Sequence, residues 1–106
     1  MDLDKLKAKY GQVAAVELPD GRAIVVRKPN DAAYYRFTDR LTQDKVNKAG
    51  AFKELVLSCV VEPATPEGKS DLEAAKAILA DYPALAVSLA AAVQELGGSD
   101  LPIQKS

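Results

Sequence analysis

Two short apolar segments joined by a Pro-Asp-Gly turn constrain the fold of this chain more than any other feature. Residues 12–18 and 22–28 are rich in Val, Ile and Leu, which favour strands, and they flank Pro19-Asp20-Gly21. Proline presets φ for a turn, aspartate can hydrogen-bond to its own backbone, and glycine takes a positive φ. The sequence therefore predicts an antiparallel β-hairpin. A lone hairpin is marginally stable, so other elements must pack against it, and its outer edges are open to another chain.

The segment that follows the hairpin carries the start signal of a helix. Asn30 is expected to cap this helix, which we predict to run to about Lys48. Tyr35 lies about 100° away from the apolar side of the helix and is expected to be exposed. The apolar residues at helical spacing, which we expect in the core, are Tyr34, Phe37 and Leu41.

Residues 51–62 form the most hydrophobic segment of the chain. We predict a helix of about three turns here, with a strand as the alternative for residues 51–61, because hydrophobic periodicity does not separate the two. Cys59 lies on the apolar side of the segment with no base beside it in the sequence. We therefore expect Cys59 to be a buried core residue. Leu57 lies away from that side and is a candidate surface residue.

The second half of the chain is predicted to hold two further helices. Residues 63–69 are a loop by composition, too short to separate two domains. Residues 70–73 match a capping box, in which the glutamate reaches back to the serine amide, and they predict a helix ending near Ala80. The last helix begins at about Pro83, is rich in alanine and stops at Gly97-Gly98.

Taken together, these segments predict an α+β fold, mostly helical, with about four helices and one antiparallel hairpin near the N-terminus. A chain of 106 residues is expected to form a single domain, with loose termini at residues 1–11 and 99–106. The sequence has no apolar run of membrane-spanning length, and its first residues lack the apolar core of a signal peptide. One cysteine points to a reducing compartment, so we expect a cytoplasmic protein with no membrane partner.

The composition weighs against several classes of function. The chain has no histidine and one cysteine, so most zinc sites and most acid–base mechanisms lack their usual residues. Fourteen basic and fifteen acidic residues give a net charge of −1, which argues against a nucleic-acid-binding surface. We therefore predict no enzyme activity, no metal and no cofactor. The class of function that remains is the binding of other proteins. The many apolar residues can supply a surface for self-association or a groove for a partner helix. The alternative is that these residues are all buried in a tightly packed helical core.

The order of several short signatures resembles a known family. Arg27-Lys28-Pro29 precedes an aromatic helix, Leu57-Ser58-Cys59-Val60-Val61-Glu62-Pro63 closes the hydrophobic segment, and Tyr82-Pro83-Ala84-Leu85 begins the last helix. This layout, over residues 15–98, resembles the small tail assembly chaperones of long-tailed bacteriophages and prophages. The resemblance implies a non-enzymatic protein that keeps the tape measure protein soluble in the bacterial host cytoplasm until tail tube subunits polymerise around it.

Three residues are the candidate partner-binding positions. Tyr35, Leu57 and Val87 are apolar or aromatic members of the helical segments that lie away from the predicted buried sides. An alternative to the chaperone is a small structural or completion protein that stays in the phage tail or head, with the hairpin edges joining neighbouring subunits by strand addition. A regulatory or nucleic-acid-binding module is a third possibility.

Overall fold

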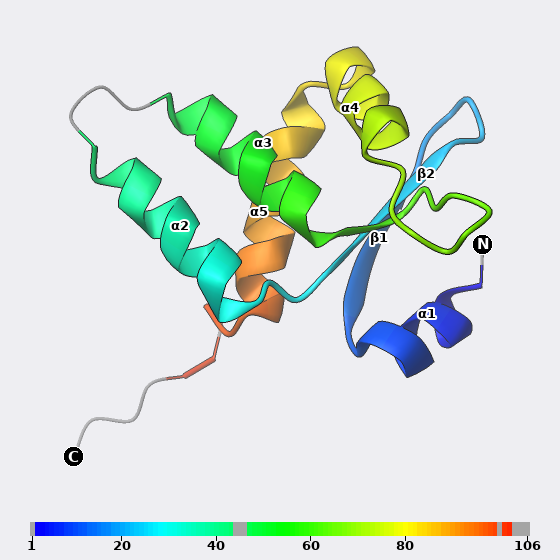
Figure 1. Cartoon of the computed structure of the whole chain (residues 1–106), viewed down its shortest axis with the longest axis horizontal. Helices are drawn as coiled ribbons and strands as arrows, with labels where there is room; N and C mark the ends of the chain where they lie inside the picture. Colours follow the sequence, from blue (N-terminus) through cyan, green and yellow to red (C-terminus); the bar gives the residue numbers. More distant parts are fainter. Residues whose placement is uncertain (1, 44–46, 100, 103–106) are drawn as a thin grey trace.

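Helices and strands are interleaved along the chain in an α+β arrangement (Figure 1). The computed structural model describes residues 2–43, 47–99 and 101–102. These residues contain five helices and one three-stranded antiparallel sheet, which corrects the expectation of about four helices and a lone hairpin. The elements in chain order are α1 (Leu3–Tyr10), β1 (Val13–Glu17), β2 (Ala23–Arg27), α2 (Asp31–Leu41), α3 (Lys48–Cys59), β3 (Val60–Glu62), α4 (Leu72–Asp81) and α5 (Ala84–Leu96).

The predicted hairpin is present as β1 and β2. The two strands pair in a regular antiparallel register from Val13↔Arg27 to Glu17↔Ala23. Gly21 has a φ of 92°, which favours glycine at the tip of the turn. β3 pairs antiparallel with the other side of β2, so the strand order is β1-β2-β3. The hairpin prediction is confirmed, and the third strand is an addition to it.

The hydrophobic segment 51–62 divides into a helix and a strand. The helix α3 ends at Cys59, and Val60 is extended, with φ −66° and ψ 132°. Val60 and Val61 are β-branched residues that suit a strand. Their backbone reaches the free side of β2, where pairing satisfies hydrogen-bonding groups of both strands. The prediction of one helix to residue 62 is therefore wrong over its last three residues.

The helix that begins after Asn30 is shorter than predicted. Asn30 caps it as expected, and its side-chain oxygen accepts a hydrogen bond from the amide of Ala33 at 2.7 Å. The helix ends at Leu41 and does not continue to Lys48, which instead opens α3. A second asparagine explains the new start, because Asn47 accepts a hydrogen bond from the amide of Gly50 at 3.0 Å and caps α3.

The N-terminal segment is a helix in place of the loose terminus that we expected. Asp2 caps α1 by accepting a hydrogen bond from the amide of Lys5 at 3.2 Å, and Gly11 ends the helix with a φ of 80°. At the other end of the chain, the expected loose segment 99–106 lies mostly outside the described residues.

The capping of α4 differs from the predicted capping box. The N-cap is Asp71, whose carboxylate accepts a hydrogen bond from the amide of Ala74 at 3.1 Å. The hydroxyl of Ser70 donates instead to the backbone oxygen of Val60, which ties the loop to β3. Glu73 forms an exposed ion pair with Lys76. The neighbouring aspartate takes over the cap because Ser70 is used to hold the strand.

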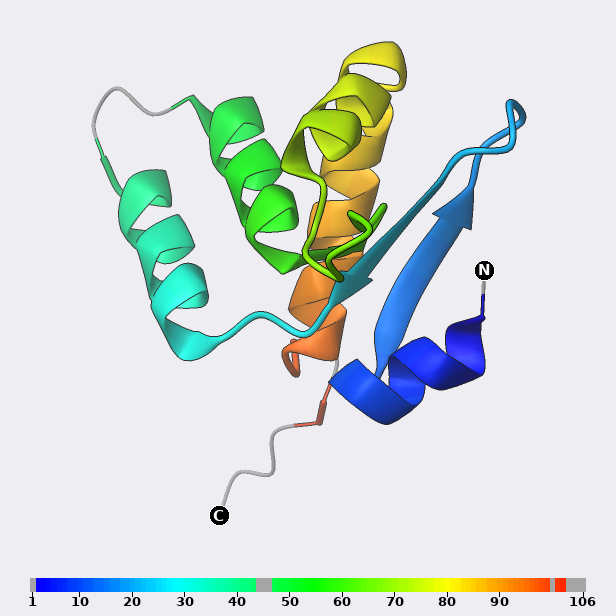
Figure 2. The same ribbon diagram turned by 45° about the vertical axis from the view of Figure 1, so that its right-hand side comes forward.

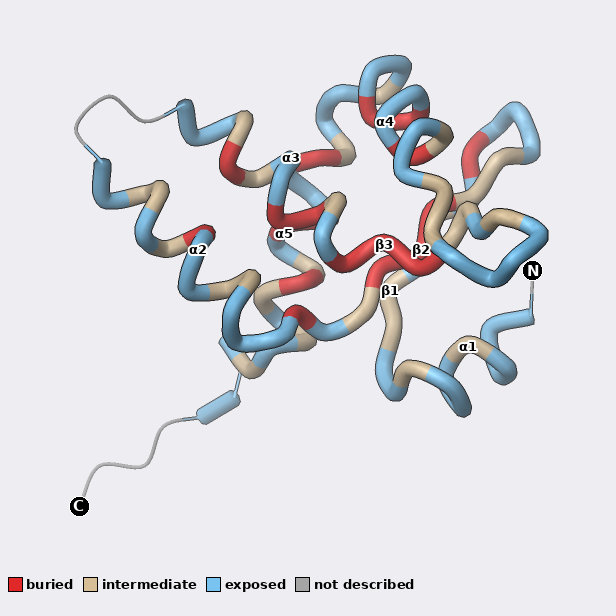
Figure 3. Tube along the Cα trace, viewed as in Figure 1, coloured by how far each residue is buried: buried red, intermediate tan, exposed pale blue. Residues whose placement is uncertain are grey.

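Helices cover the sheet unequally on its two faces (Figures 1 and 2). On one face, α5 packs on β1 and β2, α3 packs on β2, and α2 lies outside against α3. On the other side lies α1. Ile24, Val25 and Val26 of the central strand are completely buried, and Figure 3 shows the buried residues running from β2 and β3 into the helices. Cys59 is 1% exposed, which confirms its place in the core.

Candidate protein-binding surfaces

A groove of about 600 Å³ lies where the start of α2 meets the end of α5. These two helix ends lie far apart in the sequence and side by side in the fold (Figure 2). The walls carry both charges, from Lys28 and Asp31, and two aromatic rings. The lining residues are Lys28, Pro29, Asn30, Asp31, Tyr34, Tyr35, Gln94, Gly97, Gly98 and Ser99.

The two tyrosines of the groove differ in their environment. Tyr34 packs against the core, and its ring lies 6.1 Å from that of Phe37, which in turn lies 5.7 Å from that of Phe52. Tyr35 is 65% exposed. The helical spacing therefore predicted Tyr35 correctly, since it is exposed at the rim of the groove, whereas Tyr34 is half-buried and packs against the core from its margin.

The floor of the groove depends on a close approach between two loops. A Cβ atom on Gly97 would lie 3.3 Å from Cγ of Pro29, tighter than ordinary van der Waals contact. Glycine therefore lets the end of α5 meet the segment between β2 and α2. This contact places Gln94 and Ser99 beside the N-terminus of α2.

Leu57 lies in a different part of the surface from Tyr35. It is half-buried near the end of α3 and packs against the core, so it is less accessible than we expected. It lines a separate hollow of about 460 Å³, together with Tyr10, Arg27 and Lys69 among others. This hollow shares no residue with the α2–α5 groove.

Val87 is exposed on α5, as predicted, with 54% of its surface accessible. It lines neither the α2–α5 groove nor the hollow beside Leu57. The three candidate residues thus come from three helices, and the fold does not gather them into one site. Of the three, Tyr35 alone combines high exposure with a concave surface beside it.

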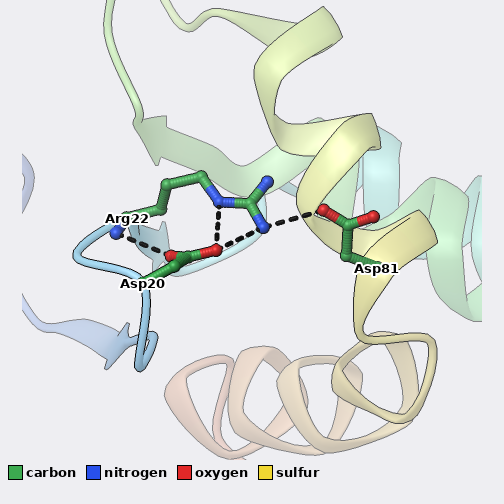
Figure 4. A network of polar contacts seen from close by, with 3 residues as sticks. All are labelled: Asp20, Arg22 and Asp81. Atoms are coloured by element: carbon green, nitrogen blue, oxygen red, sulfur yellow. Dashed lines mark hydrogen bonds and ion pairs between the residues drawn. The ribbon is translucent and has the colours of Figure 1, made fainter.

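An ionic network that the sequence analysis did not predict joins the hairpin turn to α4 (Figure 4). The guanidinium of Arg22 donates from Nε to Oδ2 of Asp20 at 2.8 Å and from Nη2 to Oδ2 of Asp81 at 2.8 Å. The Asp20 carboxylate also accepts from the backbone amide of Arg22 at 3.0 Å. Asp81 lies 59 residues from Arg22, so no local pattern signals the contact.

The charges in this network stabilise one another. The hydrogen bond from the Arg22 side chain holds the pKa of Asp20 below its ordinary value. The two carboxylates raise the pKa of Arg22, which stays protonated. All three side chains are exposed to solvent, so the network orients the hairpin tip more than it stabilises the fold.

Cys59 has the chemistry of a core residue. Burial raises the pKa of its thiol, and this effect outweighs the contact with the Ser58 hydroxyl at 3.7 Å, which acts in the opposite direction. A protonated, buried thiol is a poor nucleophile.

Within residues 2–43, 47–99 and 101–102, no three His, Cys, Asp or Glu side chains lie close enough to hold a metal ion. In the same part of the chain no single helix is long and apolar enough to cross a membrane. The helices α4 and α5 reach that length and apolar composition only together, and the break between them bends the pair by 120°.

Comparison with known proteins places the chain in a family. Residues 6–105 match the family described as a domain of unknown function, DUF6848, and the chain belongs to this family. The fold is similar to that of an uncharacterised protein, RBSTP2171, from Bacillus stearothermophilus. That likeness covers 99% of this chain and 100% of the other, with a TM-score of 0.63 and 24% sequence identity, so it shows the fold alone. No curated protein matches the sequence.

Proposed function

We propose that this protein is a tail assembly chaperone of a long-tailed phage or prophage. It acts without catalysis, by binding the tape measure protein in the host cytoplasm and releasing it when the tail tube polymerises. The proposal starts from the resemblance of the short signatures at Arg27-Lys28-Pro29, at residues 57–63 and at residues 82–85. The surface of the fold adds a physical argument.

The observation that carries the proposal is the exposed ring of Tyr35 at the rim of the α2–α5 groove. Tyrosine is enriched at the centre of protein interfaces because it buries a large ring and satisfies its hydroxyl. The two aromatic rings of this groove can contact apolar side chains of a client helix. Lys28 and Asp31 on its walls can each meet an opposite charge on the polar flank of that helix.

The first test is co-expression with a tape measure protein encoded beside this one. We expect the client to become soluble and to co-purify with the wild-type chain. Tyr35→Ala should weaken binding of the client by about tenfold or more, since a central aromatic contact is worth about 2 kcal/mol. Tyr35→Phe is the matched control, because it keeps the ring and should keep most of the binding.

Two results would contradict parts of this proposal, the first the chaperone function itself and the second the site at which it binds. One is a client that stays insoluble while this protein purifies alone. The other, binding that Tyr35→Ala leaves unchanged, would contradict the α2–α5 groove as the binding site of the client. Circular dichroism of the variants separates a lost contact from a lost fold.

A second candidate is a small structural or completion protein that remains in the phage tail or head. The outer edge of β1, which pairs with no other strand among the described residues, favours it, because strand addition at an edge joins subunits in an assembly. A fixed copy number of this protein in purified particles would support this candidate, and its absence from them would support the chaperone.

A further inference from the structure

The outer edge of β1 presents a regular row of backbone hydrogen-bonding groups. Within the described part of the chain, β1 pairs with β2 alone. The amide of Leu18 donates to the backbone oxygen of Arg22 at 2.8 Å, in line with the β1–β2 register. Hydrogen-bonded pairs alternate along an antiparallel ladder, so Val13, Ala15 and Glu17 direct their amides and carbonyls outward.

The two edges of the sheet differ in how they are protected. β3 has three residues, a register shift against β2 and Pro63 directly after it, three features that discourage further strand pairing. β1 has five residues in an unbroken register, and its sequence Val-Ala-Ala-Val-Glu contains no proline, lysine or arginine. Among the described residues, therefore, one edge of the sheet is blocked and the other is regular and open.

We infer that β1 is a homodimer interface, at which the β1 strands of two copies pair antiparallel about a two-fold axis at Ala15. The sheet then continues through six strands. In this register Val13 faces Glu17 of the second copy, and Ala15 faces Ala15. The three outward-facing residues of each copy meet in three hydrogen-bonded pairs, which gives six hydrogen bonds, two per pair.

The surface beside the edge fits this arrangement. Ala14 and Val16 point to the helical side of the sheet, where they pack against the core. A hollow of about 400 Å³ opens there between β1 and the end of α5, lined by Ala14, Ala92 and Leu96 among others. In the proposed register Val16 of the second copy lies directly beside Ala14, in a closely spaced pair, and extends the apolar contact along this hollow.

A second copy of β1 fits this edge without placing like charges opposite each other. The axis residue is alanine, and the one charged residue of β1, Glu17, faces a valine. Within the paired strands no two like charges therefore face each other.

Analytical ultracentrifugation of the full chain tests the dimer. We expect a monomer–dimer equilibrium with a dissociation constant below about 1 mM. Ala15→Lys places two like charges directly opposite each other and should weaken the dimer about fivefold or more, and so should Ala15→Glu. An equimolar mixture of these two variants should restore a dimer with one copy of each, because the pair is then of opposite charge.

The mixture keeps the test independent of any folding defect, since misfolded variants do not rescue each other. Ala77→Lys, at an exposed position on α4, is the matched control and should dimerise like the wild type.

A wild type that stays monomeric at about 1 mM overturns the inference. A species that grows beyond two copies overturns it as well, because a two-fold interface closes at the dimer. Dimers that the Ala15 variants leave unchanged also overturn it. The inference stands or falls apart from the client of the chaperone.

Discussion

Leu55 and Leu57 provide a sharp test of how the segment 51–62 is folded. Leu55 is 2% exposed and belongs to the core, whereas Leu57 is half-buried at its margin. Two positions apart on a helix, the side chains point about 200° away from each other, but on a strand they would share one face. Truncating each leucine to alanine should therefore have unequal effects in this structure.

The expected magnitude follows from burial. Leucine to alanine removes three carbons, or about 2.4 kcal/mol of transfer free energy at roughly 0.8 kcal/mol per buried CH₂. A cavity left in the rigid core raises the loss for Leu55→Ala to about 3 kcal/mol. Leu57→Ala loses about half of the transfer term and leaves no enclosed cavity, so we expect about 1 kcal/mol.

Urea unfolding of the two variants measures these losses. The midpoints should fall by unequal amounts with an unchanged slope, and the melting temperature of Leu55→Ala should drop by roughly 15 °C. Equal losses at the two positions would refute the helical assignment of residues 55–57. A loss below about 1 kcal/mol at Leu55 would refute its place in the core.

Three further predictions concern single side chains. Cys59 should react slowly with a thiol reagent in the native protein and rapidly in urea. Because burial raises its pKa, its contribution to stability is complete below the ordinary value of 9.0 and declines at higher pH, and Cys59→Ala should remove that alkaline decline in urea midpoints. Gly21→Ala should cost about 1 kcal/mol in the same unfolding assay, because its φ of 92° strains any side chain. The hydrogen bond from Arg22 lowers the pKa of Asp20, so the contribution of Asp20 to folding stability is present above pH 3.8 and is lost as the pH falls. Asp20→Asn should therefore reduce the loss of stability at acid pH, measured by urea unfolding at a series of pH values.

The hairpin could be predicted because its signal is local. Pro19, Asp20 and Gly21 specify the turn, and the apolar residues on each side specify the strands. The third strand could not, because β3 pairs with a strand more than thirty residues earlier, and Val60 and Val61 suit a helix or a strand equally in their local pattern. The α1 helix was missed for a related reason: a short terminal helix depends on its cap and its docking.

For the candidate surface, the sequence could predict the exposure of single residues but not how they come together. Helical spacing placed Tyr35 outside the core, and exposure confirms it. The groove beside it could not be predicted, because it joins residues 28–35 to residues 94–99 through the contact of Gly97 with Pro29. The ion pair between Arg22 and Asp81 could not be predicted either, because the two residues lie 59 positions apart in the sequence.

The burial of β2 on both faces sets an order in which this protein opens. Val25 alternates with Ile24 and Val26, which belong to the core under the helices, so it points to the opposite side of the sheet, and it is fully buried although none of the α1 residues, all of them described, is buried itself. Detaching α1 therefore costs far less free energy than unfolding the core, and its amides should exchange with solvent through local opening. The amides of β2 should exchange through global unfolding. The underside of the sheet is thus the first apolar surface that the protein uncovers when it is mildly destabilised.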